Sequence, residues 1–431
     1  MEQNHIDKQS SIMVLEAIRA GIPSRELVGR LPDLRQKQLS TIDEDLQSLE
    51  AGKAVKGRVL WGEYGQGKTH FLKQVEKHIL AKGYAVSYIS LSPDLGLNNF
   101  TSFFPALASR VITQDAQIPG LLNKLLDYRF PPQKWDELLD SKDKLSHPLP
   151  LLIFESFQNH DSREMIVLYN SLMGKKENLT FAKHLVKQDR KYEFQAMPKF
   201  LLRDHYKAFM EFLPLLIQAL GYKGWVLLID ELEIIGRMGR VSRLNSYRNL
   251  SWLLRLGSEH RLPVYTLAAS AKSLQEEVFW GVKKHDANDM PRLAMERGDE
   301  ATYKLLLDFF SQITDDRGLV LKQESVAKLT PLLDALLEVH QIAIPWRHEP
   351  PNRMVIDFLK RVDPRMKPIR QTIRMFIETL DIYSVYGEVP GKFKEKLMEL
   401  YDFDDTIGEN GDDDPPARGF EETPLRDMFE S

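Results

Sequence analysis

The sequence predicts an α/β protein in which a parallel sheet carries a long helical insertion and is followed by an all-helical C-terminal lid. Three observations lead to this fold class. A glycine-rich loop joins a short apolar strand to an amphipathic helix, a later apolar strand ends in two acidic residues, and stretches of helical periodicity separate and follow these strands. With 431 residues, 43% of them hydrophobic, the chain is long enough for two or three structural units.

The composition excludes several classes of protein. The chain contains no cysteine, which rules out disulfides, thiolate zinc sites and cysteine nucleophiles. Its histidines form no zinc motif, because His348-Glu349 is followed at once by two prolines. No apolar run approaches the roughly 18 residues that cross a membrane, and the polar N-terminus is unlike a signal peptide. We therefore expect a cytoplasmic protein with no membrane association.

The charge is unevenly distributed along the chain. The formal net charge is −4, but acidic residues far outnumber basic ones in residues 402–431, so the remainder is mildly basic. That stretch sets many aspartates among glycine and proline, with few apolar residues, which predicts a disordered acidic tail. A solubilising end is one interpretation of the tail, and a docking segment that uses Phe420 and Phe429 is the other.

A phosphate-binding loop is the most informative motif. Residues 62–69 read Gly-Glu-Tyr-Gly-Gln-Gly-Lys-Thr, a full G-x-x-x-x-G-K-[ST] pattern, between an apolar strand at 58–61 and a helix that ends near Gly83. In this motif backbone N–H groups curl around a polyphosphate, the lysine reaches the β- and γ-phosphates, and the hydroxyl binds Mg²⁺. The expected ATP-binding residues here are Gly62, Glu63, Tyr64, Gly65, Gln66, Gly67, Lys68, Thr69 and His70.

A second motif ends a later strand. After a strand at 85–91 and a helical stretch of more than a hundred residues, the apolar strand 225–229 runs into Asp230 and Glu231. This pattern is typical of a Walker B motif, in which the aspartate holds the Mg²⁺ shell together with Thr69 and the glutamate polarises the attacking water. A glutamate directly after the aspartate favours the additional-strand (ASCE) class of P-loop NTPases, which includes AAA+ proteins, and makes Glu231 and Lys68 candidate catalytic residues.

Another apolar strand, residues 263–269, ends at Ser270. In the additional-strand class the strand beside Walker B carries a polar residue near the γ-phosphate. Ser270 is the candidate for this sensing role and Thr266 is the alternative. An ordinary serine at a strand end is the third interpretation.

Helical periodicity resumes after residue 300 and predicts that the C-terminal part of the chain is helical. The lead into the last of these helices is similar to the start of the last lid helix of AAA+ proteins, where an arginine reaches back to the nucleotide. Arg365 or Arg370 would then stabilise transition-state charge, although either could be a surface cation. We expect a helical segment at 1–50, an α/β core at 51–290 with the insertion at about 95–222, a lid at 291–385, a terminal helix at 386–401 and the tail at 402–431.

Arginines cluster after the Walker B strand and leave three interpretations open. Arg240, Arg243 and Arg248 lie in a stretch that also contains Tyr247 and Trp252. One of these cations could be an arginine finger that completes a neighbouring subunit's site, the group could contact nucleic-acid phosphates, or it could be a solvated face. Arg292, which follows the next strand and its helix, is a further finger candidate.

The chain also resembles a known family. The succession of Gly21-Ile22-Pro23-Ser24, the loop with its flanks at 61–71, and Leu228-Ile229-Asp230-Glu231-Leu232-Glu233 is similar to the BrxD-like P-loop ATP-binding proteins of BREX phage-defence systems. The resemblance covers about 20–385 and adds Ile22 and Pro23 to the candidate nucleotide-binding residues. It implies an AAA+ ATPase related to replication initiators, typically encoded beside a large helicase. Glu63 and Gln66 depart from the smaller residues common in such loops.

The sequence therefore predicts a Mg-ATP-dependent AAA+-like ATPase that acts with DNA-processing partners in phage defence. We expect a homo-oligomer or a nucleotide-dependent assembly, with a helicase as partner and DNA bound directly or through that partner. Too few residues follow 385 for a winged-helix DNA reader, so autonomous sequence-specific DNA binding is not expected. Two alternatives stay open: an ATP-dependent regulatory switch or scaffold with negligible turnover, and a replication-initiator-like DNA loader.

Overall fold

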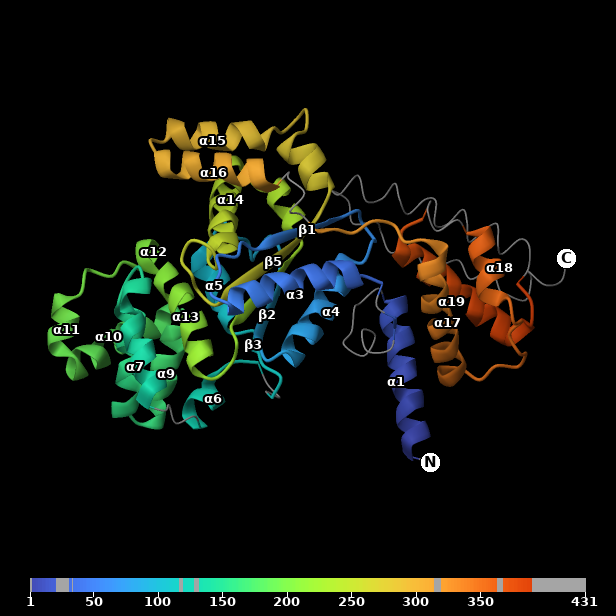
Figure 1. Cartoon of the computed structure of the whole chain (residues 1–431), viewed down its shortest axis with the longest axis horizontal. Helices are drawn as coiled ribbons and strands as arrows, with labels where there is room; N and C mark the ends of the chain where they lie inside the picture. The colour runs from blue at the N-terminus through green and yellow to red at the C-terminus, as the bar shows by residue number, and fades with distance from the viewer. Residues whose placement is uncertain are drawn as a thin grey trace. The chain divides into compact units, whose positions relative to one another are not determined.

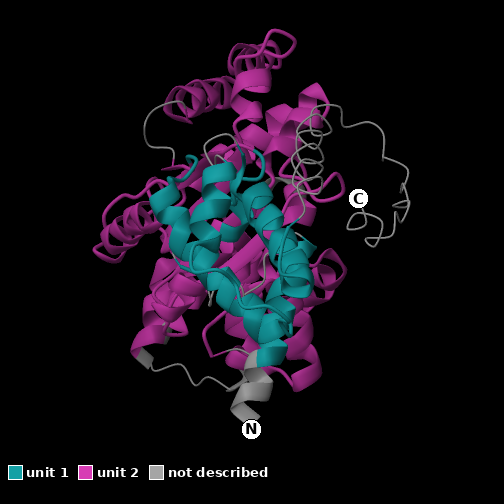
Figure 2. Ribbon diagram, turned by 90° about the vertical axis from the view of Figure 1, so that its right-hand side faces the viewer, with its two compact units in different colours: residues 1–34, 64–70, 322–431 teal, residues 35–63, 71–321 magenta. Residues whose placement is uncertain are grey.

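The chain divides into two compact units. Unit 1 comprises residues 1–34, 64–70 and 322–431, and unit 2 comprises residues 35–63 and 71–321 (Figure 2). The computed structural model describes residues 2–20, 31–32, 34–115, 119–127, 132–313, 319–362 and 367–389.

Unit 2 is built on a six-stranded sheet with the strand order β3-β2-β4-β5-β1-β6 (Figure 1). Every strand pair is parallel except β2 with β3. The mixed α/β class with a mainly parallel sheet is therefore confirmed. The strands are β1 (Arg58–Gly62), β2 (Ala85–Ser90), β3 (Val111–Ile112), β4 (Trp225–Asp230), β5 (Val264–Ala271) and β6 (Leu319–Val320).

The two central strands are buried at every position, as expected for a parallel sheet that is covered on both faces. Successive side chains of β4 enter different cores, because strand residues alternate between the faces of a sheet. Leu227 and Ile229 join one hydrophobic cluster, whereas Val226 and Leu228 join the other. A continuous apolar run without alternation is thus the sequence signature of this strand.

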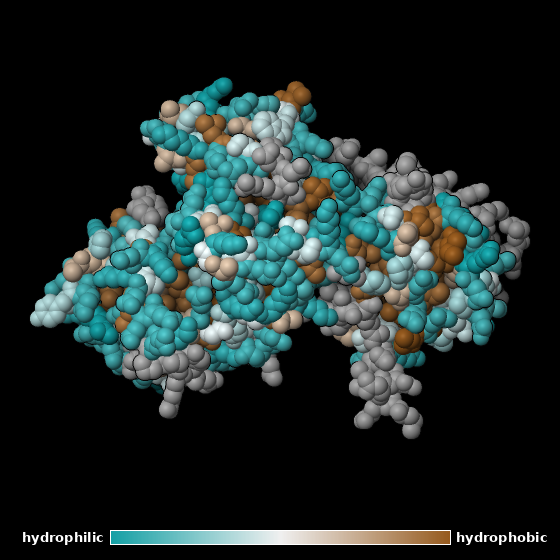
Figure 3. Space-filling view, viewed as in Figure 1, coloured by the Kyte–Doolittle hydropathy of each residue, from teal (hydrophilic) through white to brown (hydrophobic). Residues whose placement is uncertain are grey.

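Helices supply the apolar cover on each face of the sheet. The cluster that contains Val226 also takes in side chains of α3 (Gln36–Glu50) and α4 (Lys68–Ala81). The opposite cluster takes in side chains of α5 (Phe100–Ala108), α13 (Lys207–Ala219) and α14 (Arg240–Arg255). Hydrophilic residues predominate on the outer face that Figure 3 shows.

The helical insertion between β2 and β4 is present. Besides α5 and α13, it contains short helices that pack on one another through the larger cluster (Figure 1). They are α6 (Leu122–Asp127), α7 (Pro132–Leu139), α8 (Leu149–Ser156), α9 (Ser162–Leu172), α10 (Lys176–Asp189), α11 (Lys191–Ala196) and α12 (Leu202–His205).

A helix pair follows β5. Helices α15 (Asp286–Glu296) and α16 (Glu300–Ile313) pack on α14, where the Tyr247 ring lies 5.3 Å from that of Phe310. These helices belong to unit 2, and β6 then pairs with β1. The compact unit thus continues to residue 321, whereas the sequence predicts that the core ends at 290.

Unit 1 joins the two ends of the chain. Val14 and Leu15 of α1 (Glu2–Arg19) pack with Val339 of α17 (Val326–Ala343) and Ile377 of α19 (Ile369–Tyr386). A second cluster adds the apolar face of α18 (Met354–Arg361). The sequence groups α1 and α3 in one N-terminal segment, but the structure places α1 in unit 1 and α3 against the sheet of unit 2.

The two-residue strands β3 and β6 were not expected from the sequence, because runs this short carry no detectable periodicity. None of the helices within the described residues is long and apolar enough to cross a membrane. Most of the expected terminal helix and the whole acidic tail lie outside the described residues.

Candidate nucleotide site

The phosphate loop has the backbone geometry that its sequence predicts. It follows β1 directly, and α4 begins at Lys68. Gly65 and Gly67 have φ values of +75° and +84°, which glycine adopts without strain. Such turns aim successive N–H groups at a common point and, with the positive end of the following helix, suit an anion. The expected order of strand, loop and helix is confirmed.

Within unit 1 the start of α19 lies against this loop. The Arg370 amide donates to the Gly65 carbonyl at 3.1 Å. A Cβ added at Gly65 would lie 3.0 Å from Pro368 Cβ, so the approach leaves little room for a side chain. The structure thus brings the backbone of Arg370 to the loop, while its side chain is exposed. Arg365, Ile22 and Pro23 lie outside the described residues.

The loop side chains differ in exposure. Gln66 and Lys68 are buried, whereas Thr69 and His70 are half-buried. Tyr64 is 72% exposed. The first residue of α4, Lys68, is therefore shielded from solvent, whereas Tyr64 is largely exposed.

Asp230 ends β4 in unit 2 with a side chain that is almost fully buried. Its Oδ2 accepts a hydrogen bond from the Tyr88 hydroxyl at 2.9 Å, and its Oδ1 accepts one from the Glu231 amide at 3.0 Å. A carboxylate has about four lone-pair positions, so these bonds leave acceptor capacity for water on a metal ion. The geometry of Asp230 fits the expected metal-binding role.

Glu231 has an unusual backbone. Its φ and ψ are 63° and 40°, in the left-handed region that side chains other than glycine rarely adopt. Among the described non-glycine residues only Arg261 shares a positive φ. Such strain tends to be kept where it serves a function. The Glu231 side chain is exposed.

The end of β5 lies between the two motif strands in the sheet. Ser270 is opposite Trp61 in the register of β5 with β1, and its buried hydroxyl lies 3.2 Å from the Ala271 carbonyl, to which it donates. The Thr266 hydroxyl instead donates to the Leu253 carbonyl of α14 at 3.0 Å. Thr266 therefore serves helix packing, and Ser270 occupies the strand end expected of a sensor.

A charge pair that was not expected from the sequence joins β1 to β5. Lys272 Nζ lies 3.0 Å from Glu63 Oε1. The pair depends on the β1–β5 register, which places Gly62 opposite Ala271. No motif in the sequence marks Lys272, because strand order and register are not visible in a single strand.

The arginines that follow β4 differ in their surroundings. Arg243 donates from Nε and Nη2 to the carboxylate of Asp286 at 2.7 and 3.0 Å, and Asp286 is fully buried. The Tyr247 hydroxyl donates to the same carboxylate at 2.8 Å. This geometry favours a structural role for Arg243 within unit 2.

Other arginines face solvent. Arg240 and Arg292 are exposed, and Arg248 lies 3.8 Å from Asp299 with its side chain 41% exposed. Burial, and secondarily the charge of Arg248, lower the pKa of neighbouring Lys207 to about 8. The exposure of Arg240 and Arg292 fits the finger and phosphate-contact interpretations, whereas Arg248 is close to Asp299.

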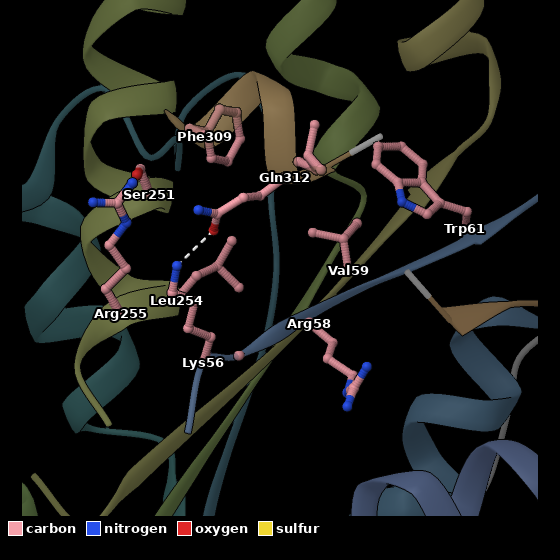
Figure 4. A pocket seen from close by; sticks show the side chains of 11 residues that line it. Lys56, Arg58, Val59, Trp61, Ser251, Leu254, Arg255, Phe309 and Gln312 are labelled. Atoms are coloured by element: carbon pink, nitrogen blue, oxygen red, sulfur yellow. Dashed lines mark hydrogen bonds between the residues drawn. The ribbon is translucent and has the colours of Figure 1, made fainter. Parts of the chain in front are cut away.

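A small cavity lies beside β1 rather than at the phosphate loop (Figure 4). Its volume is about 60 Å³, and Lys56 Nζ donates across it to Gln312 Oε1 at 2.7 Å. Binding pockets for drug-sized ligands enclose roughly 300–1,000 Å³, so a nucleotide cannot fit here. The remaining lining residues include Val59, Trp61, Leu254 and Phe309.

Comparison with known families supports the nucleotide site. The model of one family, described as BREX system ATP-binding protein BrxC/D, matches residues 6–135 and 199–397. The matched ranges contain both the glycine-rich loop and the Asp230-Glu231 pair, and the gap between them, residues 136–198, falls in the helical insertion. No curated protein matches the chain. Because the match spans most of the sequence, the chain belongs to the BrxC/D family of BREX system ATP-binding proteins.

Proposed function

We propose that the protein hydrolyses ATP as an AAA+-like ATPase and that this cycle switches an assembly in BREX phage defence. The observation that carries the proposal is the sheet order. Gly62 and Asp230 end the parallel strands β1 and β4, and β5 lies between those strands. An intervening strand of this kind gives the additional-strand ATPases their name, and it supports the class that the Asp-Glu pair favours.

Each role in the proposed reaction has a residue suited to it. Lys68 would hold the β- and γ-phosphates, Thr69 and Asp230 would hold Mg²⁺, and Glu231 would orient the attacking water. The positive φ values at Gly65 and Gly67 and the remaining acceptor capacity of Asp230 fit such a ligand. Mg²⁺ binds few protein carboxylates and relies on phosphate oxygens, and when bound it neutralises phosphate charge.

The helices of unit 1 would form the lid. The hydrogen bond from the Arg370 amide to Gly65 supports this, because it puts the start of α19 at the loop backbone. Arg370 or Arg365 would then approach the phosphates, and Ser270 would sense the γ-phosphate. Ile22 and Pro23 are proposed as nucleotide contacts from the family resemblance alone.

The exposed cations and the membership of a multi-protein system support a proposal about partners. Arg240, Arg248 or Arg292 would act as a finger toward a second copy, which makes a homo-oligomer or nucleotide-dependent assembly the expected active form. A helicase is the proposed partner, with DNA reached directly or through it. If nucleic acid stimulates turnover, the stimulation should fall steeply as salt increases.

The deciding experiment is steady-state ATP hydrolysis by the purified protein, with and without DNA. Lys68→Ala and Glu231→Gln should each reduce turnover by about a hundredfold or more, and only Lys68→Ala should also weaken ATP binding. The exposed Lys77→Ala on the same helix is the matched control and should keep full activity. Turnover that survives both site substitutions would overturn the proposal. Tight binding without turnover would favour the regulatory switch.

A further inference from the structure

Tyr88 lies beside the Walker B aspartate because of strand register. It is opposite Leu228 in the pairing of β2 with β4, so its side chain lies on the same sheet face as those of Leu228 and Asp230. Asp230 is two positions farther along β4, a diagonal neighbour that a long aromatic side chain can reach. The Tyr88 hydroxyl accordingly contacts Asp230 Oδ2 at 2.9 Å.

The Tyr88 ring is itself held in place by α4. Lys73 Nζ lies 3.5 Å from the ring centroid, and it also pairs with Glu76 Oε2 at 2.8 Å. Glu76 is 1% exposed, so its buried carboxylate holds the ammonium group of Lys73 in place. A cation over a ring face stabilises that geometry. Helix α4 therefore holds the Tyr88 ring in place, and with it the hydroxyl that donates to Asp230.

The Tyr88 hydroxyl is the donor in this hydrogen bond, and Asp230 Oδ2 is the acceptor. With the Glu231 amide on Oδ1, each oxygen of Asp230 has one fixed donor.

We propose that Tyr88 is a positioning residue that sets the Mg²⁺ affinity of the site by locking the carboxylate of Asp230. This inference rests on the proposed Mg-ATP site. Donors behind a metal-binding carboxylate fix its rotamer, and their loss weakens metal affinity. Without the Tyr88 hydroxyl, only Oδ1 of Asp230 has a hydrogen-bond donor. The carboxylate would then lose rotational freedom when Mg²⁺ binds, which lowers the affinity.

The test is Tyr88→Phe, which keeps the ring and its contact with Lys73. We expect the Mg²⁺ concentration for half-maximal turnover to rise about tenfold. Turnover at saturating Mg²⁺ and the KM for ATP measured there should stay within about twofold of wild type, since no group that touches ATP is removed. A merely structural tyrosine would not produce this selective shift with rescue by Mg²⁺.

Tyr265→Phe is the matched control. The Tyr265 hydroxyl donates to Asp45 Oδ2 at 2.7 Å from a buried position on β5, so this variant loses an equivalent bond away from Asp230. Its Mg²⁺ dependence should equal that of wild type. An equal shift in both variants would overturn the inference, because sheet destabilisation would then explain the effect.

Binding of a non-hydrolysable ATP analogue, titrated with Mg²⁺ and with EDTA, separates the two proposals. If wild type shows no Mg²⁺-dependent binding, the proposed function fails. If wild type shows it and Tyr88→Phe has the same Mg²⁺ dependence, the inference about Tyr88 fails while the function stands. Should Tyr88→Phe not fold, Lys73→Gln decides. It removes the cation from the ring but can still donate to Glu76, and an unchanged Mg²⁺ dependence would count against the inference.

Discussion

At the scale of single residues, Glu231 combines a candidate catalytic carboxylate with a strained backbone. Its φ of 63° is retained at the strand end where water would be activated. A left-handed conformation costs a side chain about 1–3 kcal/mol, and glycine avoids most of this cost. The strained backbone thus coincides with the position at which the sequence predicts the catalytic glutamate.

Glu231→Gly should therefore stabilise the fold while it abolishes turnover. We expect the free energy of unfolding to rise by about 1 kcal/mol, whereas Glu231→Gln, which keeps the strain, should leave it unchanged. Urea denaturation measures both. Arg261→Gly, at the other positive φ, is the control, and it should stabilise the protein without loss of activity. A clear destabilisation by Glu231→Gly would show that the backbone is not strained.

The Glu63–Lys272 pair lies at the first variable position of the phosphate loop. Glu63 puts a negative charge where a polyphosphate would bind, and Lys272 offsets it. Because both side chains are partly exposed, Lys272→Ala should weaken ATP binding by only about two- to fivefold. Isothermal titration of the variants against ATP measures this change.

The double variant tests the charge argument directly. Adding Glu63→Gln to Lys272→Ala should restore the affinity, since the uncompensated charge is then gone. Lys304→Ala, which breaks the exposed pair with Glu300, should have no effect. Weakening that persists in the double variant would instead mean that Lys272 contacts the nucleotide itself.

At the residue scale, the sequence offers candidate site residues where motif chemistry requires a fixed spacing. The positions from Gly62 to Thr69 and the Asp230-Glu231 pair follow from motif chemistry. Tyr88 and Lys272 do not, because their partners are set by the register of β2 with β4 and of β1 with β5. The sequence also does not show that Arg243, unlike the nearby arginines, has a structural role, because its buried partner Asp286 lies on another helix.

At the scale of elements, His160 links helices α9 and α10 of the insertion through two carboxylates. His160 Nδ1 lies 2.8 Å from Glu164 of α9, and its Nε2 lies 2.7 Å from Asp189, the last residue of α10. Burial opposes protonation, but the hydrogen bonds to the two carboxylates outweigh it and raise the pKa of His160 above its ordinary value. The protonated histidine therefore stabilises the folded insertion.

The sign of the pH dependence follows from that shift. A raised folded-state pKa means that the contribution is complete below the unfolded value of about 6.5 and is lost as pH rises through the folded value. The loss of thermal stability in His160→Gln should thus be largest near pH 5.5 and shrink toward pH 8.5. His147 is the contrast, because burial lowers its pKa, so its contribution is lost as pH falls. A pH-independent effect of His160→Gln would contradict a stabilising interaction between protonated His160 and the two carboxylates.

Element prediction was accurate for β1, β2, β4 and β5, each within two residues, because each is a distinct apolar run between turn signals. Strands β3 and β6 were not predicted, because two residues are too few to show a hydrophobic pattern. The short helices of the insertion were expected as a group, but their mutual packing depends on long-range contacts that periodicity does not contain.

At the scale of the whole molecule, unit 1 is assembled from both ends of the chain. Leu15 of α1 is 1% exposed and packs in the cluster that contains Val339 and Ile377. Leu15→Ala should cost about 2–5 kcal/mol through lost burial and the cavity left behind. We expect hydrogen exchange to speed up in α17 and α19 but not in β4 and β5.

Leu185→Ala provides the reciprocal control. Leu185 is 2% exposed on α10, so its loss should increase exchange in the insertion and leave α17 and α19 protected. Uniform loss of protection in either variant would mean that the two units unfold as one. The sequence could not predict this division, because it places α1 next to α3, and only tertiary packing assigns them to different units.

The contact between Gly65 and the segment Pro368–Arg370 has a consequence for biosynthesis. A ribosome adds roughly 5–20 residues per second, so the glycine loop leaves the exit tunnel some tens of seconds before the helix start that closes on it. A nascent chain therefore displays the loop without its cover for most of translation. The hydrogen bond between Arg370 and Gly65 can therefore form only after α19 has emerged.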